Sequence, residues 1–148
     1  MRSTNPPDDH IERARDDYYT QRDACAALEA ELAAVDGPPP APGAESIPAR
    51  RVRRLRERVA QARRARDAAH TVLGRALLEQ FAGDISALAG CSQRLRRSGD
   101  TAALQAAAEV EESFRRACLS VLARWPELAE EAQRRLRAPA AEDGRILH

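Results

Sequence analysis

Apolar residues recur at alternating steps of three and four between residues 11 and 35. This spacing places them on one face of an α-helix, and such a face must pack against another helix. The pattern therefore predicts a long amphipathic helix over residues 9–36, about 40 Å in length, after a disordered stretch at residues 1–8. Its apolar face consists of Ile11, Ala14, Tyr18, Gln21, Cys25, Leu28, Leu32 and Val35, of which Gln21 alone is polar.

A proline-rich segment follows, and beyond it a second helix has the same apolar spacing. Residues 37–49, GPPPAPGAESIPA, are predicted to form a stiff turn, because proline lacks the backbone N–H and clashes with the preceding helical turn. Two apolar faces joined by such a turn predict an antiparallel helical hairpin, similar to a coiled coil, over residues 9–76. The second face, on a helix that starts near Ser46, consists of Val52, Leu55, Val59, Ala62, Arg66, Ala69, Leu73 and Ala76.

Shorter apolar patterns over residues 77–137 predict a small helical bundle. Its helices are separated at Gly83 and Asp84, at Gly99 and Asp100, and at Trp125 and Pro126. In the first two pairs, glycine is expected to end one helix and aspartate to cap the next. In the third pair, proline disfavours helical geometry at the residue before it.

One acid falls inside the apolar face of the helix that follows Asp100. The face reads Leu104, Ala107, Glu111, Phe114 and Cys118, with Val110, Val121 and Leu122 beside it. An acid in that position is expected to set the register or to pair with an arginine. The last helix is expected to pack through Leu128, Ala132 and Leu136.

These patterns together predict an all-α fold. No segment has the polar–apolar alternation or the β-branched residues of a strand. The predicted architecture is a long antiparallel helical hairpin plus a small C-terminal helical bundle, with a disordered tail at residues 138–148. The core is expected to be thin, because 31 residues are alanine and only five are aromatic.

Charge is divided unevenly between the two arms of the predicted hairpin. Residues 1–36 hold nine acidic residues and four arginines, a net charge of −5. Residues 50–67 hold nine arginines and two acidic residues, a net charge of +7. Folding back at the proline-rich turn would place Glu29 and Glu31 near residues 55–57. The acids would then neutralise arginines within one molecule and fix the pairing of the two helices.

The basic residues of the second arm are all arginines, since the chain contains no lysine. The first interpretation is a solvated face of the hairpin, the second a docking surface for an acidic protein, and the third a nucleic-acid contact. Nucleic acid is the less favoured partner, because no aromatic residue is interleaved for base stacking and the whole chain has a net charge of +1. The candidate interaction residues are Arg50, Arg51, Arg53, Arg54, Arg56, Arg58, Arg63, Arg64 and Arg66.

One short spacing resembles a known ribonuclease motif. Arg64 and His70 are separated by five residues, and Arg63 and His70 by six. The spacing resembles the arginine–histidine motif of the HEPN ribonuclease superfamily, in which residues of two protomers form a composite RNA-cleaving site. The resemblance covers this spacing alone, and the polar residue that usually follows the family's arginine is replaced by Ala65. It implies a weaker alternative function in which His70 is catalytic.

Other catalytic and metal chemistry lacks its usual residue patterns. Asp67 and His70 are spaced like half of a two-metal site, but the chain has no second pair of this kind. The three cysteines lack the short paired spacing of a zinc site. A chain without lysine cannot form a P-loop or a lysine Schiff base. We therefore expect that the protein is not an enzyme and that it binds neither a metal ion nor a cofactor.

The sequence thus predicts a non-enzymatic helical module for protein–protein interaction, as a structural, assembly or adaptor protein. We expect a homo-oligomer or a helical protein partner, and no membrane, since no apolar stretch approaches the roughly 18 residues of a spanning helix. The alternative is a nucleic-acid-associated protein that uses the arginine-rich helix at residues 50–66. Widely spaced cysteines and an N-terminus without an apolar core indicate a cytoplasmic protein, or a virion component if a phage encodes it. Abundant arginine and alanine are typical of the GC-rich genes of some bacteria and phages.

Overall fold

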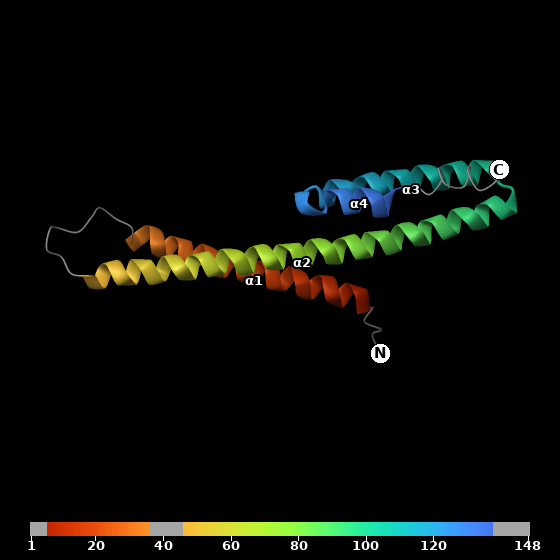
Figure 1. Cartoon of the computed structure of the whole chain (residues 1–148). Helices are drawn as coiled ribbons and strands as arrows, with labels where there is room; N and C mark the ends of the chain where they lie inside the picture. The colour runs from red at the N-terminus through yellow and green to blue at the C-terminus, as the bar shows by residue number, and fades with distance from the viewer. Residues whose placement is uncertain (1–5, 36–45, 138–148) are drawn as a thin grey trace. The chain divides into compact units, whose positions relative to one another are not determined.

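A computed structural model of the chain describes residues 6–35 and 46–137, which form four α-helices and one short 3-10 helix (Figure 1). In chain order the elements are α1 (Pro6–Val35), α2 (Ser46–Ser98), α3 (Thr101–Leu122), η1 (Pro126–Leu128) and α4 (Ala129–Leu136). No strand occurs in this described part of the chain, and the predicted all-α fold is confirmed.

Several boundaries of the elements differ from the prediction or lie beyond the described residues. α1 begins at Pro6, inside the stretch expected to be disordered, and three residues before the predicted start at Asp9. α2 begins at Ser46, where the second helix is predicted. Most of the proline-rich turn and all of the predicted tail at residues 138–148 lie outside the described residues.

The chain divides into two compact units, residues 1–73 and residues 74–148. We call residues 1–73 the hairpin unit, which holds α1 and the first half of α2. We call residues 74–148 the C-terminal unit, which holds the second half of α2 with α3, η1 and α4. α2 is continuous through both units over its 53 residues.

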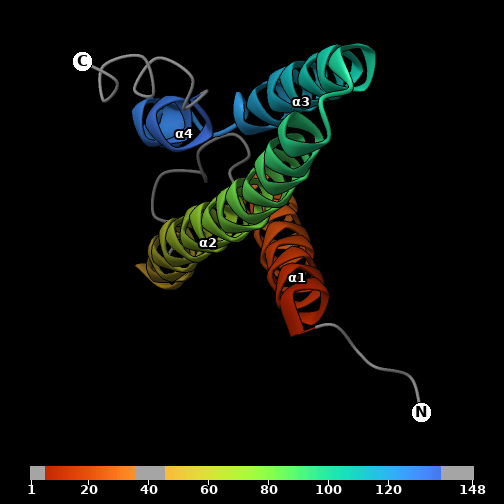
Figure 2. The ribbon, with the colours of Figure 1, turned by 90° about the vertical axis from the view of Figure 1, so that its right-hand side faces the viewer.

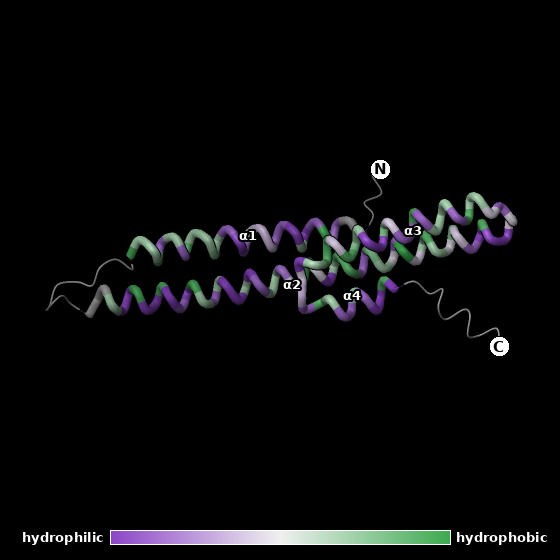
Figure 3. Tube along the Cα trace, turned by 90° about the horizontal axis from the view of Figure 1, so that it is seen from above, coloured by the Kyte–Doolittle hydropathy of each residue, from purple (hydrophilic) through white to green (hydrophobic). Residues whose placement is uncertain are grey.

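The hairpin unit packs along the two apolar faces that the sequence predicts. α1 and the first half of α2 lie side by side in opposite directions (Figure 1). Ala14 and Cys25 of α1 are buried, as are Leu55 and Val59 of α2. All other predicted members of the two faces are at least partly buried, except Val35, which is exposed. Polar and apolar residues alternate along the first half of α2 (Figure 3), so that one side of the helix is apolar.

The register of the hairpin differs from the prediction. Glu29, expected near residues 55–57, accepts a hydrogen bond from Arg63, at an Nε–Oε1 distance of 2.8 Å. The prediction assumed that both helices end level at a compact turn. The packing of the apolar faces sets the register instead, and it brings Tyr18 against His70, with ring centroids 5.1 Å apart.

This register leaves the start of α2 without α1 beside it. Cys25 lies next to Arg66, and Glu29 next to Arg63. The end of α1 at Val35 is therefore level with a point about two to three turns into α2, and the first turns of α2 extend beyond α1 (Figure 1). Four of the nine candidate arginines lie in these first turns: Arg50, Arg51, Arg53 and Arg54.

The predicted helix boundary at Gly83 and Asp84 is wrong, because α2 continues to Ser98. The Asp84 side chain does not cap a helix but accepts a hydrogen bond from Gln80 one turn earlier, at 3.1 Å. Buried Leu78 and Ile85 show that an apolar stripe continues on both sides of the glycine. A glycine inside a helix costs only about 1 kcal/mol, which continuous packing offsets.

Beyond α2, the C-terminal unit turns at the two remaining positions that the sequence predicts. Gly99 has a φ of 74°, the left-handed geometry that ends a helix after Ser98. Asp100 caps α3 by accepting a hydrogen bond from the Ala103 amide at 3.0 Å. Pro126 begins η1, so the predicted break after α3 is confirmed. α4 then packs beside α3 (Figure 2).

The core of the C-terminal unit is built from large side chains. Leu78, Trp125, Leu128 and Leu136 are each at most 3% exposed. The Trp125 ring lies directly on the backbone of α2 at Gly74, where a Cβ atom would come within 2.6 Å of the ring. This close approach requires glycine. Two residues that the sequence suggests as core, Val110 and Val121, are exposed.

Ion pairs link α4 to the second half of α2. Arg135 binds the Glu79 carboxylate through both terminal guanidinium nitrogens, and Arg75 pairs with Glu131 at 3.4 Å. The hydrogen bond from Arg135 holds the pKa of Glu79 below its usual value. These pairs fix the short α4 at the edge of the core.

None of the described helices contains an apolar stretch that could cross a membrane.

Candidate interaction surface

The nine candidate arginines lie on one α-helical stretch of α2, which we call the arginine segment (residues 50–66). Its apolar residues Val52, Leu55 and Val59 pack toward α1 and fix the rotation of the helix. At about 100° per residue, the side opposite this apolar face carries four arginines, which we call the arginine face. The arginine face consists of Arg50, Arg53, Arg54 and Arg64.

All members of the arginine face are exposed, and so are the arginines at its flanks. Among the described residues, no ion pair joins Arg50, Arg53, Arg54 or Arg64 to an acid. The flanking residues are Arg51, Arg56, Arg58 and Arg63, while Arg66 alone is partly buried.

Arg63 and Arg66 of the segment form ion pairs within the hairpin unit. Arg63 pairs with Glu29 across the two helices at 2.8 Å, and Arg66 pairs with the adjacent Asp67 at 3.0 Å. Glu31 is exposed, with no ion pair to an arginine among the described residues, contrary to the expected pairing. Of the two acids expected to pair with arginines of α2, Glu29 therefore does so in the described residues and Glu31 does not.

A small polar cluster lies between the two helices of the hairpin unit. Arg66 contacts the Cys25 sulfur at 3.8 Å, and the thiol donates to Glu29 at 3.5 Å. Burial raises the pKa of Cys25, and the hydrogen bond from Arg63 lowers the pKa of Glu29. A thiol that is 1% exposed and remains protonated donates a hydrogen bond but is a poor nucleophile. The cluster therefore joins the two helices at the register that the apolar faces set.

The residues that resemble the ribonuclease motif do not converge within one chain. His70 is partly buried against Tyr18, with the ring planes tilted by 48°. Arg64 is about 120° away from His70 around the helix axis. Arg63 is on the same side of α2 as His70, but its guanidinium is bound to Glu29.

Metal ligands do not gather on the described helices. Within residues 6–35 and 46–137, no three His, Cys, Asp or Glu side chains could together hold a metal ion. Asp67, the other half of the candidate pair with His70, is bonded to Arg66.

A second polar cluster lies in the C-terminal unit and involves a buried arginine that the sequence does not reveal. Arg115 is 6% exposed and pairs with Glu111 at 3.0 Å and with Glu112 at 3.3 Å. Ser92 of α2 donates to Glu111 at 3.5 Å. The expected pairing of Glu111 with an arginine is confirmed. Arginine at this position looks like a surface residue, and only the i, i+4 spacing from Glu111 could have suggested the pair.

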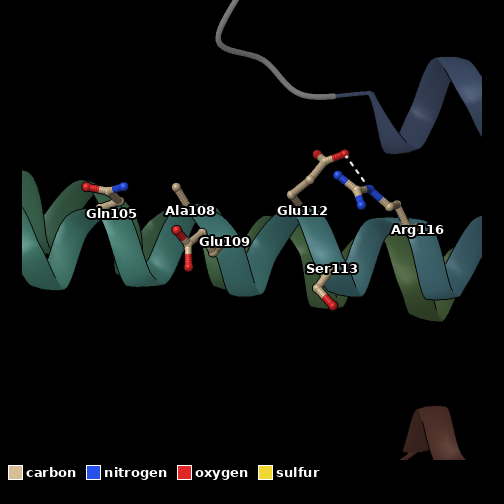
Figure 4. A pocket seen from close by; sticks show the side chains of 6 residues that line it. All are labelled: Gln105, Ala108, Glu109, Glu112, Ser113 and Arg116. Atoms are coloured by element: carbon tan, nitrogen blue, oxygen red, sulfur yellow. Dashed lines mark hydrogen bonds and ion pairs between the residues drawn. The ribbon is translucent and has the colours of Figure 1, made fainter.

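The outer side of α3 has a shallow depression (Figure 4). Its lining belongs to α3 alone, and the Arg116–Glu112 ion pair at 3.3 Å crosses it. Side chains from a single helix do not surround a substrate. The lining residues are Gln105, Ala108, Glu109, Glu112, Ser113 and Arg116.

No protein-family model, curated protein or solved structure matches this chain.

Proposed function

We propose that this protein is a non-enzymatic helical interaction module, a structural, assembly or adaptor protein that self-associates through its hairpin unit. The observation that carries the proposal is the exposure of the arginine face. Arg50, Arg53, Arg54 and Arg64 point away from the apolar face of α2, and no ion pair joins them to an acid among the described residues. Like charges held close together on one helix repel each other, and an acidic partner relieves that repulsion.

The thin core of the hairpin unit supports the same proposal. Its buried apolar side chains in the described residues are two alanines, one cysteine, one valine and two leucines. Burial stabilises by about 25 cal/mol per Å² of apolar surface, and alanine supplies little of it. Leu28 and Leu32 of α1 remain partly exposed. A unit with so little buried apolar surface gains stability when a second helical surface docks on it.

The direct test is the mass of the full chain in solution, measured by light scattering over about two decades of concentration. A self-associating module gives a mass above that of one chain, which falls on dilution. The measurement is repeated with bulk RNA. A chain that stays monomeric at every concentration and binds nothing contradicts the proposal.

A second candidate function is nucleic-acid association, favoured by the four arginines where α2 extends beyond α1. If several guanidinium groups contact phosphates, the logarithm of the affinity falls linearly with the logarithm of the salt concentration, by about 0.7–0.9 per contact. The measurement is fluorescence anisotropy with labelled single- and double-stranded probes. A flat salt response, or no binding at about 50 mM salt, contradicts this function.

A further inference from the structure

The outer side of α1 carries a stripe of acidic residues, which we call the acidic stripe. Asp9, Glu12, Asp16 and Asp23 fall within about 60° of each other around the helix axis, opposite the buried Ala14 and Cys25. Glu12, Asp16 and Asp23 are exposed, and Asp9 is partly buried. Asp23 contacts its neighbour Arg22 at 3.2 Å.

The acidic stripe and the arginine face lie at opposite ends of the hairpin unit. In the described residues, the end formed by residues 9–23 and 67–73 holds six acids and three arginines, a net charge of −3. The end formed by residues 24–35 and 49–66 holds three acids and nine arginines, a net charge of +6. One chain therefore carries two complementary charged surfaces that its own register keeps apart.

The two surfaces also match in length. Asp9 to Asp23 and Arg50 to Arg64 each cover fourteen residue steps, which is about 21 Å of helix. Glu57 is the one acid among the outward side chains of the arginine segment, and Arg53 and Arg54 lie one turn before it. An acidic helix of the same length can therefore place its carboxylates against arginines on both sides of Glu57.

We propose that the arginine face of one chain docks on the acidic stripe of a second copy. This inference rests on the proposed self-association and names the surfaces that carry it. α1 and α2 pack through their apolar faces, so the two charged surfaces point away from each other on opposite sides of the hairpin. A second copy on one side cannot reach the other side. The contact is therefore heterologous, and each docked copy presents a fresh arginine face to the next one.

This geometry predicts how the copies are arranged. The acidic stripe is level with residues near His70, because Tyr18 packs on that side chain. The centre of the arginine face is about ten or more residues nearer the start of α2, so consecutive copies are staggered along the hairpin by about 20 Å. Such contacts give open chains or closed rings rather than a twofold dimer.

The test uses two charge-reversed variants of the full chain. The first carries Arg50→Glu, Arg53→Glu and Arg64→Glu, and the second carries Glu12→Arg, Asp16→Arg and Asp23→Arg. Each variant alone presents two surfaces of the same sign, so its self-association weakens by about tenfold or more. An equal mixture of the two variants restores assembly, because each acidic surface again meets a basic one. Circular dichroism confirms that both variants keep their helices.

A matched control reverses three exposed arginines of the C-terminal unit: Arg94→Glu, Arg124→Glu and Arg134→Glu. Its net charge equals that of the first variant, and it self-associates like the wild type. The mass of the wild type is followed as its concentration rises, since a heterologous contact gives species larger than two chains.

Any other result overturns the inference, and the result itself shows which part of it is wrong. If each reversed variant assembles like the wild type, the docking surfaces are wrong while the self-associating module stands. Assembly that stops at two chains contradicts the heterologous contact. A wild type that is monomeric at all concentrations removes the proposed function itself, and assembly only on added RNA assigns the arginine face to nucleic acid.

Discussion

The two units of this chain share one helix but are stabilised by different means. The hairpin unit packs through small residues such as Ala14 and Cys25, and most of its charged side chains lie outside. The C-terminal unit packs through leucines and Trp125, and ion pairs such as Arg135–Glu79 hold its last helix. The difference indicates that packing energy is concentrated in the C-terminal unit, whereas the surfaces suited to recognition lie on the hairpin unit.

The largest effect is expected from shortening a leucine in the core of the C-terminal unit. Leu78 is 1% exposed, so Leu78→Ala should lower the free energy of unfolding by about 3 kcal/mol through lost burial and a residual cavity. The matched change in the hairpin unit, Leu55→Ala, should cost about 2 kcal/mol, because neighbouring small residues close the space more easily. Urea unfolding followed by circular dichroism measures both. Equal costs would contradict the contrast between the two cores.

Thiol labelling can show which of the two units loses stability in the Leu78→Ala variant. Cys25 is buried in the hairpin unit and Cys118 in the C-terminal unit, while Cys91 is exposed. Burial raises the pKa of Cys25 and of Cys118, so labelling of either thiol requires local opening. In the Leu78→Ala variant, the labelling rate of Cys118 should rise more than the labelling rate of Cys25. The exposed Cys91 serves as the internal control.

The next effect concerns the buried ion pair of α3. Glu111→Ala should destabilise the chain by about 2 kcal/mol, because it removes the main partner of buried Arg115. Glu112→Ala should cost only about 0.5 kcal/mol, since that carboxylate is half exposed. Thermal unfolding of the two variants gives the difference. A larger loss for Glu112→Ala would show that the partly exposed acid is the main partner of Arg115.

A smaller effect, with opposite signs at two glycines of α2, is expected from adding a methyl group. Gly74→Ala should destabilise by about 1 kcal/mol, because its Cβ would meet the Trp125 ring at 2.6 Å and the strain exceeds the gain in helix propensity. Gly90 has no atom within 4 Å of such a Cβ, so Gly90→Ala should stabilise by about 0.5–1 kcal/mol. The denaturant concentrations at the unfolding midpoints of the two variants, compared with that of the wild type, test this difference in sign. A stabilising Gly74→Ala would disprove the close contact.

The smallest effect is the response to acid at one exposed ion pair in each unit. Arg63 lowers the pKa of Glu29 in the hairpin unit, and Arg135 lowers the pKa of Glu79 in the C-terminal unit. A lowered folded-state pKa contributes stability above the unfolded value, near 4.3 for glutamate, and the contribution is lost as the pH falls through the folded value. Glu29→Gln and Glu79→Gln should therefore lose less stability than the wild type below about pH 4.3. Acid titrations monitored by circular dichroism measure this, and unchanged titration curves would contradict it.

The apolar spacing in the sequence predicts both faces of the hairpin, because the heptad pattern states which side of each helix is buried. Gly83 was misleading, since a local helix-ending signal does not show that packing continues on both sides of it. The register was missed because it depends on how two faces interlock, and the length of a turn does not determine that. The contact of Trp125 with Gly74 joins residues 51 positions apart, and no local pattern reports it.

The site could be predicted only in part. The sequence identifies the nine arginines as candidates and the spacing places them on one helix. It does not show that Arg63 binds Glu29 or that Arg66 contacts Cys25, because both contacts depend on the register. The acidic stripe follows the same spacing of three and four with one interruption, and the total charge of residues 1–36 does not reveal it.

An arginine face differs chemically from a lysine face of equal charge. Guanidinium groups stay protonated throughout the physiological pH range, and acetyltransferases that neutralise lysine amines find no side-chain amine in a chain without lysine. Methylation of arginine retains the charge and removes only hydrogen-bond donors. The positive charge of this surface is therefore independent of pH in that range and of lysine-directed modification, whereas ionic strength still screens it.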